Sequence, residues 1–320
     1  VMQTALTEIL RVEHPVMLAG MGGVSYSRLC AAVSEAGGFG CLGASTMGDE
    51  EMVAEIAAVR ALTDKPFGVD LLTAAPQDMP AKVQAIIDGG ASVFVAGLGV
   101  PREVVDQCHE QNVIVVNMCG KVHHATAAVE AGCDLVVAQG TEAGGHTGRI
   151  ATLPLVPMIV DAVGSEVPVV AAGGVFDGRA LAAALTLGAA GVWVGTRFIA
   201  TPEARAVSGY KDRILGADET STVVTRAYTG KTCRVINTDY ADSFERSGAK
   251  PEPFPAQFLK SLGDGANHLG GDETTAGVDP DKEFMPAGQA VGAISSLTPA
   301  GDIVRSMVAE AEQALAGALG

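Results

Sequence analysis

The chain has 320 residues, of which 48% are hydrophobic and 18% are charged, and its formal net charge is −16. This composition supports a large buried core and excludes a disordered chain, and the length fits one large α/β domain or two ordinary ones. The negative charge, with no cluster of Lys or Arg, argues against nucleic acid and anionic membranes as partners.

No apolar run is long enough to cross a bilayer, and the opening "VMQTALTEIL" lacks the basic-then-apolar pattern of a secretory signal. The six cysteines are scattered along the chain without close pairs, which favours reduced thiols over metal knuckles or a disulfide framework. His123 and His124 are adjacent and would face different ways on a helix, so we interpret them as solvated. We therefore expect a cytoplasmic protein without a metal site.

Short apolar runs recur along the first two thirds of the chain, with amphipathic helical stretches such as "DEEMVAEIAAVRAL" between them. Their apolar character is nearly continuous, as expected for parallel strands buried on both faces. The eight runs are "PVMLAG", "FGCLGA", "PFGVDLL", "SVFVAG", "VIVVNM", "LVVAQG", "PVVAAGG" and "GVWVGT".

Eight strand–helix units in a row predict an α/β fold of the (β/α)₈ TIM-barrel type rather than an open doubly wound sheet. The dinucleotide fingerprint that an open sheet would carry after its first strand is only partly matched by "AGMGGVS". The pattern changes after Thr201, and we interpret residues 205–290 as an inserted lid or substrate segment. The barrel would then comprise 1–204 and 291–320, with Thr298 as the N-cap of its last helix and Pro299 as the first helical residue.

The active site of such a barrel lies at the carboxyl ends of its strands. Glycine leads five of these eight ends, which leaves room for a large flat ligand. Backbone N–H groups after strands 7 and 8 can bind one phosphate without hindrance from a Cβ atom, at Gly173, Gly174, Gly195 and Thr196.

The loop after strand 6, "GTEAGGHTGR", presents His146 among four glycines. A Schiff-base aldolase would need a lysine at a strand end, where the nearest is Lys121. A dehydrogenase of the inosine-phosphate kind would need a cysteine in the strand-6 loop, which carries Glu142 and His146 instead. Because no nucleophile is evident, the difficult chemistry is expected to belong to a cofactor.

Two segments, "AQGTEAGGHTG" and "VVAAGGVFDGRALAAALTLGAAGVWVGTRF", closely resemble the nitronate monooxygenase family, formerly called 2-nitropropane dioxygenases. That family also contains flavin-dependent enoyl-ACP reductases and some NADH:quinone reductases. The resemblance covers about residues 6–201 and the segment "MPAGQAVGAI". It implies FMN as the cofactor, with its phosphate at the glycine ends of strands 7 and 8, and NAD(P)H as a candidate reductant.

The resemblance also implies that His146 is the catalytic residue and faces the substrate near the flavin. The cofactor-binding residues that we predict are Ala19, Gly20, Met21, Gly22, Asp70, Gln139, Gly140, Gly144, Gly145, Ala172, Gly173, Gly174, Gly195, Thr196, Met285, Gly288 and Gln289.

The chain departs from the family's pattern at Asp70, where Asn is common. A carboxylate there could not donate to a flavin ring oxygen, and its charge would oppose an anionic reduced flavin. Gly22 and Gly23 also stand where the family often has Gln or Ala. The "LAGM" and "AGQ" segments look more like the enoyl-reductase branch.

We expect an FMN-dependent oxidoreductase, with oxidation of alkyl nitronates by O₂ to a carbonyl compound and nitrite as the first hypothesis. Reduction of an enoyl thioester or a quinone by NAD(P)H is the alternative at the same site. A non-redox phosphate-binding barrel is the alternative of another class. The partner is a small-molecule substrate, and a homodimer remains open.

Overall fold

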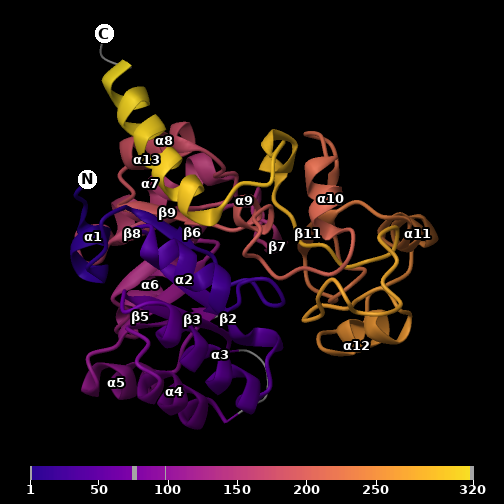
Figure 1. The fold of residues 1–320 in the computed structure, drawn as a ribbon, viewed down its shortest axis with the longest axis horizontal. Coiled ribbons are helices and arrows are strands. Elements are labelled where there is room, and N and C mark those ends of the chain that lie inside the picture. The colour runs from indigo at the N-terminus through magenta and orange to yellow at the C-terminus, as the bar shows by residue number, and fades with distance from the viewer. Residues whose placement is uncertain (1, 74–77, 98, 318–320) are drawn as a thin grey trace.

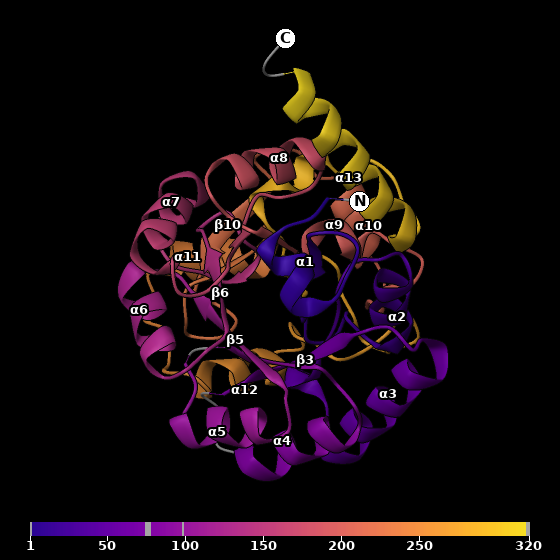
Figure 2. The ribbon, with the colours of Figure 1, turned by 90° about the vertical axis from the view of Figure 1, so that its left-hand side faces the viewer.

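The computed structural model describes residues 2–73, 78–97 and 99–317. Eight parallel strands form one sheet in the order β1-β9-β8-β6-β5-β4-β3-β2. Between β2 and β1, the Leu18 amide donates to the Phe39 carbonyl at 2.8 Å and closes the sheet into a barrel. The predicted TIM barrel is confirmed, and Figure 2 shows it as a ring of helices around the strands. The strands are β1 (Val16–Leu18), β2 (Gly40–Gly43), β3 (Phe67–Leu72), β4 (Val93–Gly97), β5 (Ile114–Cys119), β6 (Leu135–Gln139), β8 (Val169–Ala172) and β9 (Gly191–Val194).

Each of the eight predicted apolar runs coincides with one of these strands, although β5 extends one residue beyond its run, to Cys119. The runs are nearly continuously apolar because both faces of each strand are buried. One face packs inside the barrel, where Met17, Phe39 and Val137 are fully buried. The other face packs against the surrounding helices. These helices are α2 (Ser27–Glu35), α3 (Asp49–Leu62), α4 (Met79–Asp88), α5 (Arg102–Glu110), α6 (Val122–Glu130), α7 (Thr152–Val163), α8 (Gly178–Thr186), α9 (Thr196–Ile199) and α13 (Ala300–Gly317), with the 3₁₀ turn η1 (Ala44–Thr46) after β2.

The two ends of the described chain complete the barrel. Helix α1 (Ala5–Leu10) lies across its amino-terminal end, where Leu6 and Leu10 join the interior core (Figure 2). Helix α13 packs on α8 so closely that a Cβ atom at Gly178 would lie 2.3 Å from the Met307 carbonyl oxygen. The last helix begins at Ala300, one residue later than the sequence predicts.

The segment after β9 extends from the barrel as a separate lobe, seen on the right of Figure 1. It has a small core of its own around Tyr228 and Phe284. Its elements are α10 (Tyr210–Leu215), β10 (Thr222–Thr225), β11 (Cys233–Ile236), α11 (Asp239–Ser247) and α12 (Ala256–Gly263), and the 3₁₀ turn η2 (Gln289–Ala293) leads back towards α13.

The lobe is joined to the barrel by a shared sheet. Strand β7 (Gly145–His146) belongs to the loop after β6, and it pairs antiparallel with β11, with His146 opposite Cys233. The three strands lie in the order β10-β11-β7. The loop that carries the histidine is therefore held by backbone pairing to the inserted segment.

Candidate active site

A cavity of about 410 Å³ opens at the carboxyl ends of the strands, between the barrel and the inserted lobe. Of the predicted site residues, the structure brings fifteen together around this cavity. They are Ala19, Gly20, Met21, Gly22, Asp70, Gln139, Gly144, Gly145, His146, Ala172, Gly173, Gly174, Gly195, Thr196 and Gly288.

Three predicted residues lie outside the lining. Gly140 packs against α7, where a Cβ atom would lie 2.1 Å from the Thr152 hydroxyl oxygen. Met285 is fully buried in the core, and the side chain of Gln289 is exposed. Their contacts with a cofactor stay predictions, and in this structure they support the surroundings of the cavity: the backbone amide of Gln289, for example, donates to the Glu142 carbonyl at 2.8 Å.

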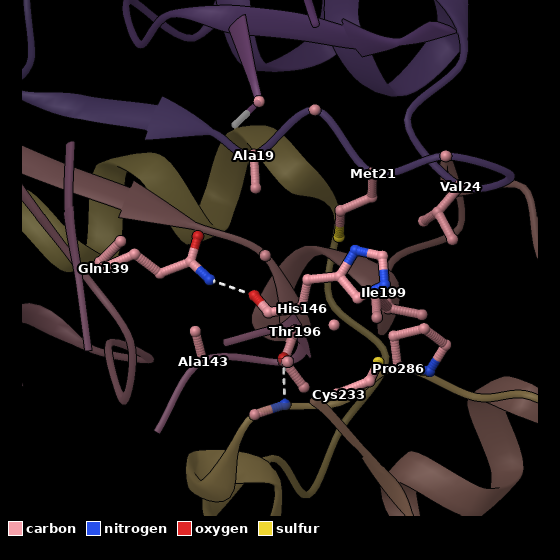
Figure 3. Close-up of a pocket in the computed structure, with 18 of the residues that line it drawn as sticks. Ala19, Met21, Val24, Gln139, Ala143, His146, Thr196, Ile199, Cys233 and Pro286 are labelled. Carbon is pink, nitrogen blue, oxygen red and sulfur yellow. Dashed lines mark hydrogen bonds between the residues drawn. The ribbon is translucent and has the colours of Figure 1, made fainter. Parts of the chain in front are cut away.

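The loop after β6 is shaped by close backbone contacts rather than left as a flexible turn. Gly145 has a positive φ of 75°, which suits glycine. The Gln139 side chain donates to the His146 carbonyl at 2.6 Å, as Figure 3 shows. Glu142 accepts from the Thr152 amide at 2.9 Å and from its hydroxyl at 2.8 Å, so its carboxylate caps α7 and does not face the cavity.

The imidazole of His146 lies in the cavity between Met21 and Pro286 (Figure 3). Its Nε2 atom is 3.1 Å from the hydroxyl oxygen of Thr229. That hydroxyl also donates to the Lys231 carbonyl at 3.1 Å and accepts from the Lys231 amide at 3.2 Å. Because the hydroxyl has a single hydrogen, we assign the proton of the ring to Nε2, which leaves a lone pair on Nδ1.

Burial, reinforced by the nearby Lys231 ammonium, lowers the pKa of His146 to about 4. The ring is therefore neutral at physiological pH and can accept a proton or a hydrogen bond at Nδ1. Thr229 lies 83 residues beyond His146 in the chain, and no local pattern in the sequence pointed to it.

The glycines at the ends of β8 and β9 form a cradle that fits an anion. Gly173 and Gly174 have positive φ angles of 103° and 74°. Within the part of the chain that the structure describes, the amides of Gly174, Gly195 and Thr196 have no hydrogen-bond acceptor. The Thr196 hydroxyl is already used, since it accepts from the Gly288 amide at 2.8 Å (Figure 3).

Side chains at the cradle would occupy the space that a phosphate needs. A Cβ atom at Gly195 would face Met21 Sδ at 3.4 Å and Ala19 Cβ at 3.5 Å, both on the cavity wall. Unpaired amides and missing side chains together suit the phosphate of a nucleotide, with its ring over the wide floor of the barrel.

Aromatic and aliphatic side chains that the sequence analysis did not single out form most of the remaining cavity wall, together with a few polar residues such as Ser45 and Thr46. Phe254 meets the His146 ring edge-to-face with 6.5 Å between centroids, and Lys231 Nζ lies 4.6 Å from the Phe254 centroid. The further apolar lining comprises Val24, Leu72, Met118, Val175, Phe176, Trp193, Ile199, Phe258, Leu269, Phe284 and Ile294.

In the described residues, no group of three or more His, Cys, Asp or Glu side chains is placed to hold a metal ion. All six cysteines are free and buried. None of the described helices is both long and apolar enough to cross a membrane.

The model of the nitronate monooxygenase family matches residues 3–310. A protein of Rhodococcus jostii, named as a (3aS,4S,5R,7aS)-5-hydroxy-7a-methyl-1-oxo-octahydro-1H-indene-4-carboxyl-CoA dehydrogenase, is 42% identical over 77% of this chain and 69% of its own. A probable nitronate monooxygenase of Staphylococcus haemolyticus is 33% identical over 79% of this chain and 83% of its own.

Two solved structures are similar over nearly their whole length. FabK from Thermotoga maritima has a TM-score of 0.90 and 32% identity, with coverage of 100% of this chain and 99% of that one. A nitroalkane oxidase from Streptomyces ansochromogenes has a TM-score of 0.84 and 29% identity, with coverage of 99% and 100%. The chain therefore belongs to the nitronate monooxygenase family and is an oxidoreductase of this flavin-dependent group.

Proposed function

We propose that the protein uses FMN to move a hydride between the flavin and an organic substrate whose reacting part is uncharged and largely apolar. The substrate class that we propose is an acyl thioester. FMN is favoured over FAD because the cavity has one phosphate cradle and the sequence has no second dinucleotide fingerprint. The amides of Gly174, Gly195 and Thr196 would hold its phosphate. When bound, the flavin supplies the two-electron redox chemistry.

The observation that carries the substrate class is the absence of charge around the cavity. Its described lining contains no Lys or Arg. His146 is neutral, and burial raises the pKa of Asp70 to about 8, so this carboxyl is mostly protonated at pH 7. An anionic substrate would lose its hydration there without contacting a cationic side chain, because Lys231 lies outside the lining, whereas a neutral acyl group would bury apolar surface against the phenylalanines.

His146 would handle the proton that accompanies hydride movement. In the oxidative direction, Nδ1 would take the proton from the carbon next to the thioester carbonyl while the neighbouring carbon gives up its hydride. The Thr229 hydroxyl would keep the hydrogen on Nε2 and orient the ring. In the reductive direction the same proton would return from the ring to the substrate.

The two relatives named as CoA dehydrogenases, at 42% and 41% identity, agree with this class. The proposal reverses the order of hypotheses from the sequence, in which nitronate oxidation came first. Nitronate oxidation remains the second candidate, supported by the family model and the Streptomyces structure. A neutral nitroalkane could also give its proton to His146.

Anaerobic mixing in a stopped-flow instrument distinguishes the two. We expect NADH or NADPH to bleach the bound flavin, and an enoyl-CoA such as crotonyl-CoA to restore its absorbance without oxygen. If propyl-2-nitronate bleaches the flavin rapidly and enoyl-CoA never reoxidises it, the second candidate is correct. Release of the cofactor by heat, followed by chromatography, identifies it, and FAD would contradict the proposed cradle.

A further inference from the structure

Asp70 is an unusual polar group on the floor of the cavity. It stands near the carboxyl end of β3, in register with Gly43 of β2 and Val95 of β4. Strand alternation directs its side chain to the barrel interior, on the same side as Cys41 and Val95. Because Asp70 lines the cavity, its carboxyl would contact a molecule bound at the bottom of the cavity.

The Asp70 carboxyl has no hydrogen bond or ion pair with any residue that the structure describes. It packs instead against the bare backbone of Gly20, where a Cβ atom would lie 2.2 Å from Asp70 Cβ and 2.7 Å from Oδ2. Because Gly20 has no side chain, the carboxyl is accommodated against the cavity wall. Its hydrogen-bonding capacity is left for a bound molecule.

The surroundings favour the protonated acid. Burial alone raises the pKa of Asp70 to about 8, without a contribution from any charged group. On β2 the titratable neighbour is Cys41, whose thiol pKa is raised by burial and then by Asp70. Strand β4 and residues 19–22 carry no titratable side chain. Among the described residues, no adjacent group therefore stabilises the carboxylate.

The position of β3 shows which part of a flavin would meet Asp70. In the closed strand order, β3 lies opposite β8, whose end carries Gly173 and Gly174 of the phosphate cradle. A phosphate at the cradle therefore directs the ring end of FMN towards Asp70. The ring's polar edge alternates carbonyl acceptors with an N–H donor.

A carboxylic acid matches this edge as a carboxamide does, since each offers one donor beside one acceptor. A carboxylate offers acceptors only and would repel the ring carbonyls. Asp70 can therefore pair with this edge only as long as the acid keeps its proton.

We propose that Asp70 binds the polar edge of the flavin ring as a neutral carboxylic acid, so that its ionisation releases the cofactor. This inference rests on flavin binding in the proposed function, but not on which substrate is used.

The test is a titration of apoprotein with FMN, followed by quenching of flavin fluorescence, at pH 7, 8 and 9. If only the protonated acid binds, the Kd scales with the reciprocal of the protonated fraction. For a pKa of about 8, the wild-type Kd rises about tenfold between pH 7 and pH 9. Asp70→Asn keeps the donor and acceptor without the titration, so its Kd stays level. Asp64→Asn, at an exposed acid just before the same strand, behaves as wild type.

Proton uptake supplies a second measurement that needs no variant at Asp70. At pH 8, binding of FMN by the wild-type apoprotein takes up about half a proton per flavin from a weakly buffered solution. Parallel pH profiles of wild type and Asp70→Asn, a folded Asp70→Asn without affinity at pH 7, or no proton uptake would each overturn the inference. Loss of turnover with an intact pH-dependent Kd would instead count against the proposed reaction.

Discussion

Gly144 is the point at which the histidine loop and the returning segment of the lobe touch backbone to backbone. A Cβ atom there would lie 2.7 Å from the carbonyl carbon of Ala287 and 2.8 Å from the amide nitrogen of Gly288. Neither atom can move aside alone, because the Gly288 amide donates to the Thr196 hydroxyl at 2.8 Å. We therefore expect Gly144→Ala to separate the loop from this segment.

Overpacking of this kind typically costs about 1–3 kcal/mol. One way to relieve the strain is movement of the Gly288 segment together with Thr196, which belongs to the phosphate cradle. In that case the same free energy raises the Kd of FMN by about 5- to 150-fold. If the closed arrangement persists, the free energy of unfolding falls by about 1–3 kcal/mol. Urea denaturation and fluorescence titration with FMN, performed on the same preparation, separate the two outcomes.

Gly148→Ala is the matched control in the same loop. Its Cβ atom would meet backbone atoms of Gly120, of which the nearest is the carbonyl oxygen at 3.4 Å, an ordinary contact, and the φ of Gly148 is not positive. We expect stability within about 0.5 kcal/mol of wild type. If Gly144→Ala matches this control in both denaturation midpoint and FMN affinity, the close approach is not a constraint and the reasoning fails.

Three further changes test the site. His146→Ala should retain FMN and lose about 10²- to 10⁴-fold in kcat, and a flavin-corrected kcat within about threefold of wild type would remove it from the chemistry. Thr229→Val should lower kcat by about fivefold with unchanged FMN affinity, since one hydrogen bond to the ring is lost, and an unchanged kcat would refute its orienting role. The double change of Gly174 and Gly195 to Val should abolish FMN binding in a barrel that still folds by circular dichroism, and full occupancy would show that the phosphate lies elsewhere. Because His146 must be neutral to act as a base and its pKa is about 4, kcat should be level from about pH 6 to 7.5 and fall as the pH drops through 4. A fall in kcat centred near pH 6.5 would contradict the lowered pKa of the buried ring.

The barrel could be predicted from the sequence because its signals are local and repeated. Runs such as "LVVAQG" are apolar throughout only if both faces are covered, and β6 lies within that run. Glycines after β8 and β9 likewise marked the ends where a backbone cradle forms. The displaced last helix was evident from Thr298, Pro299 and the helical stretch that follows.

Contacts between distant segments were beyond the sequence. The pairing of β7 with β11 and the bond from His146 to Thr229 join residues that share no local pattern. Met285 lies three residues before Gly288 and Gln289 directly after it, yet the first is buried in the core and the second is exposed to solvent. The state of Asp70 depends on burial, which no residue type reveals by itself.

The sheet shared by β7 and β11 has a consequence for engineering. The cavity-lining residues Phe254 and Phe284 lie in the lobe, whereas His146 lies on the partner strand β7. A lobe transplanted from a relative must therefore contain a strand that pairs with β7 in the same register as β11 does. Otherwise the position of His146 will change together with the cavity wall. Substrate range in this protein is better altered one wall residue at a time than by exchanging the lobe as a cassette.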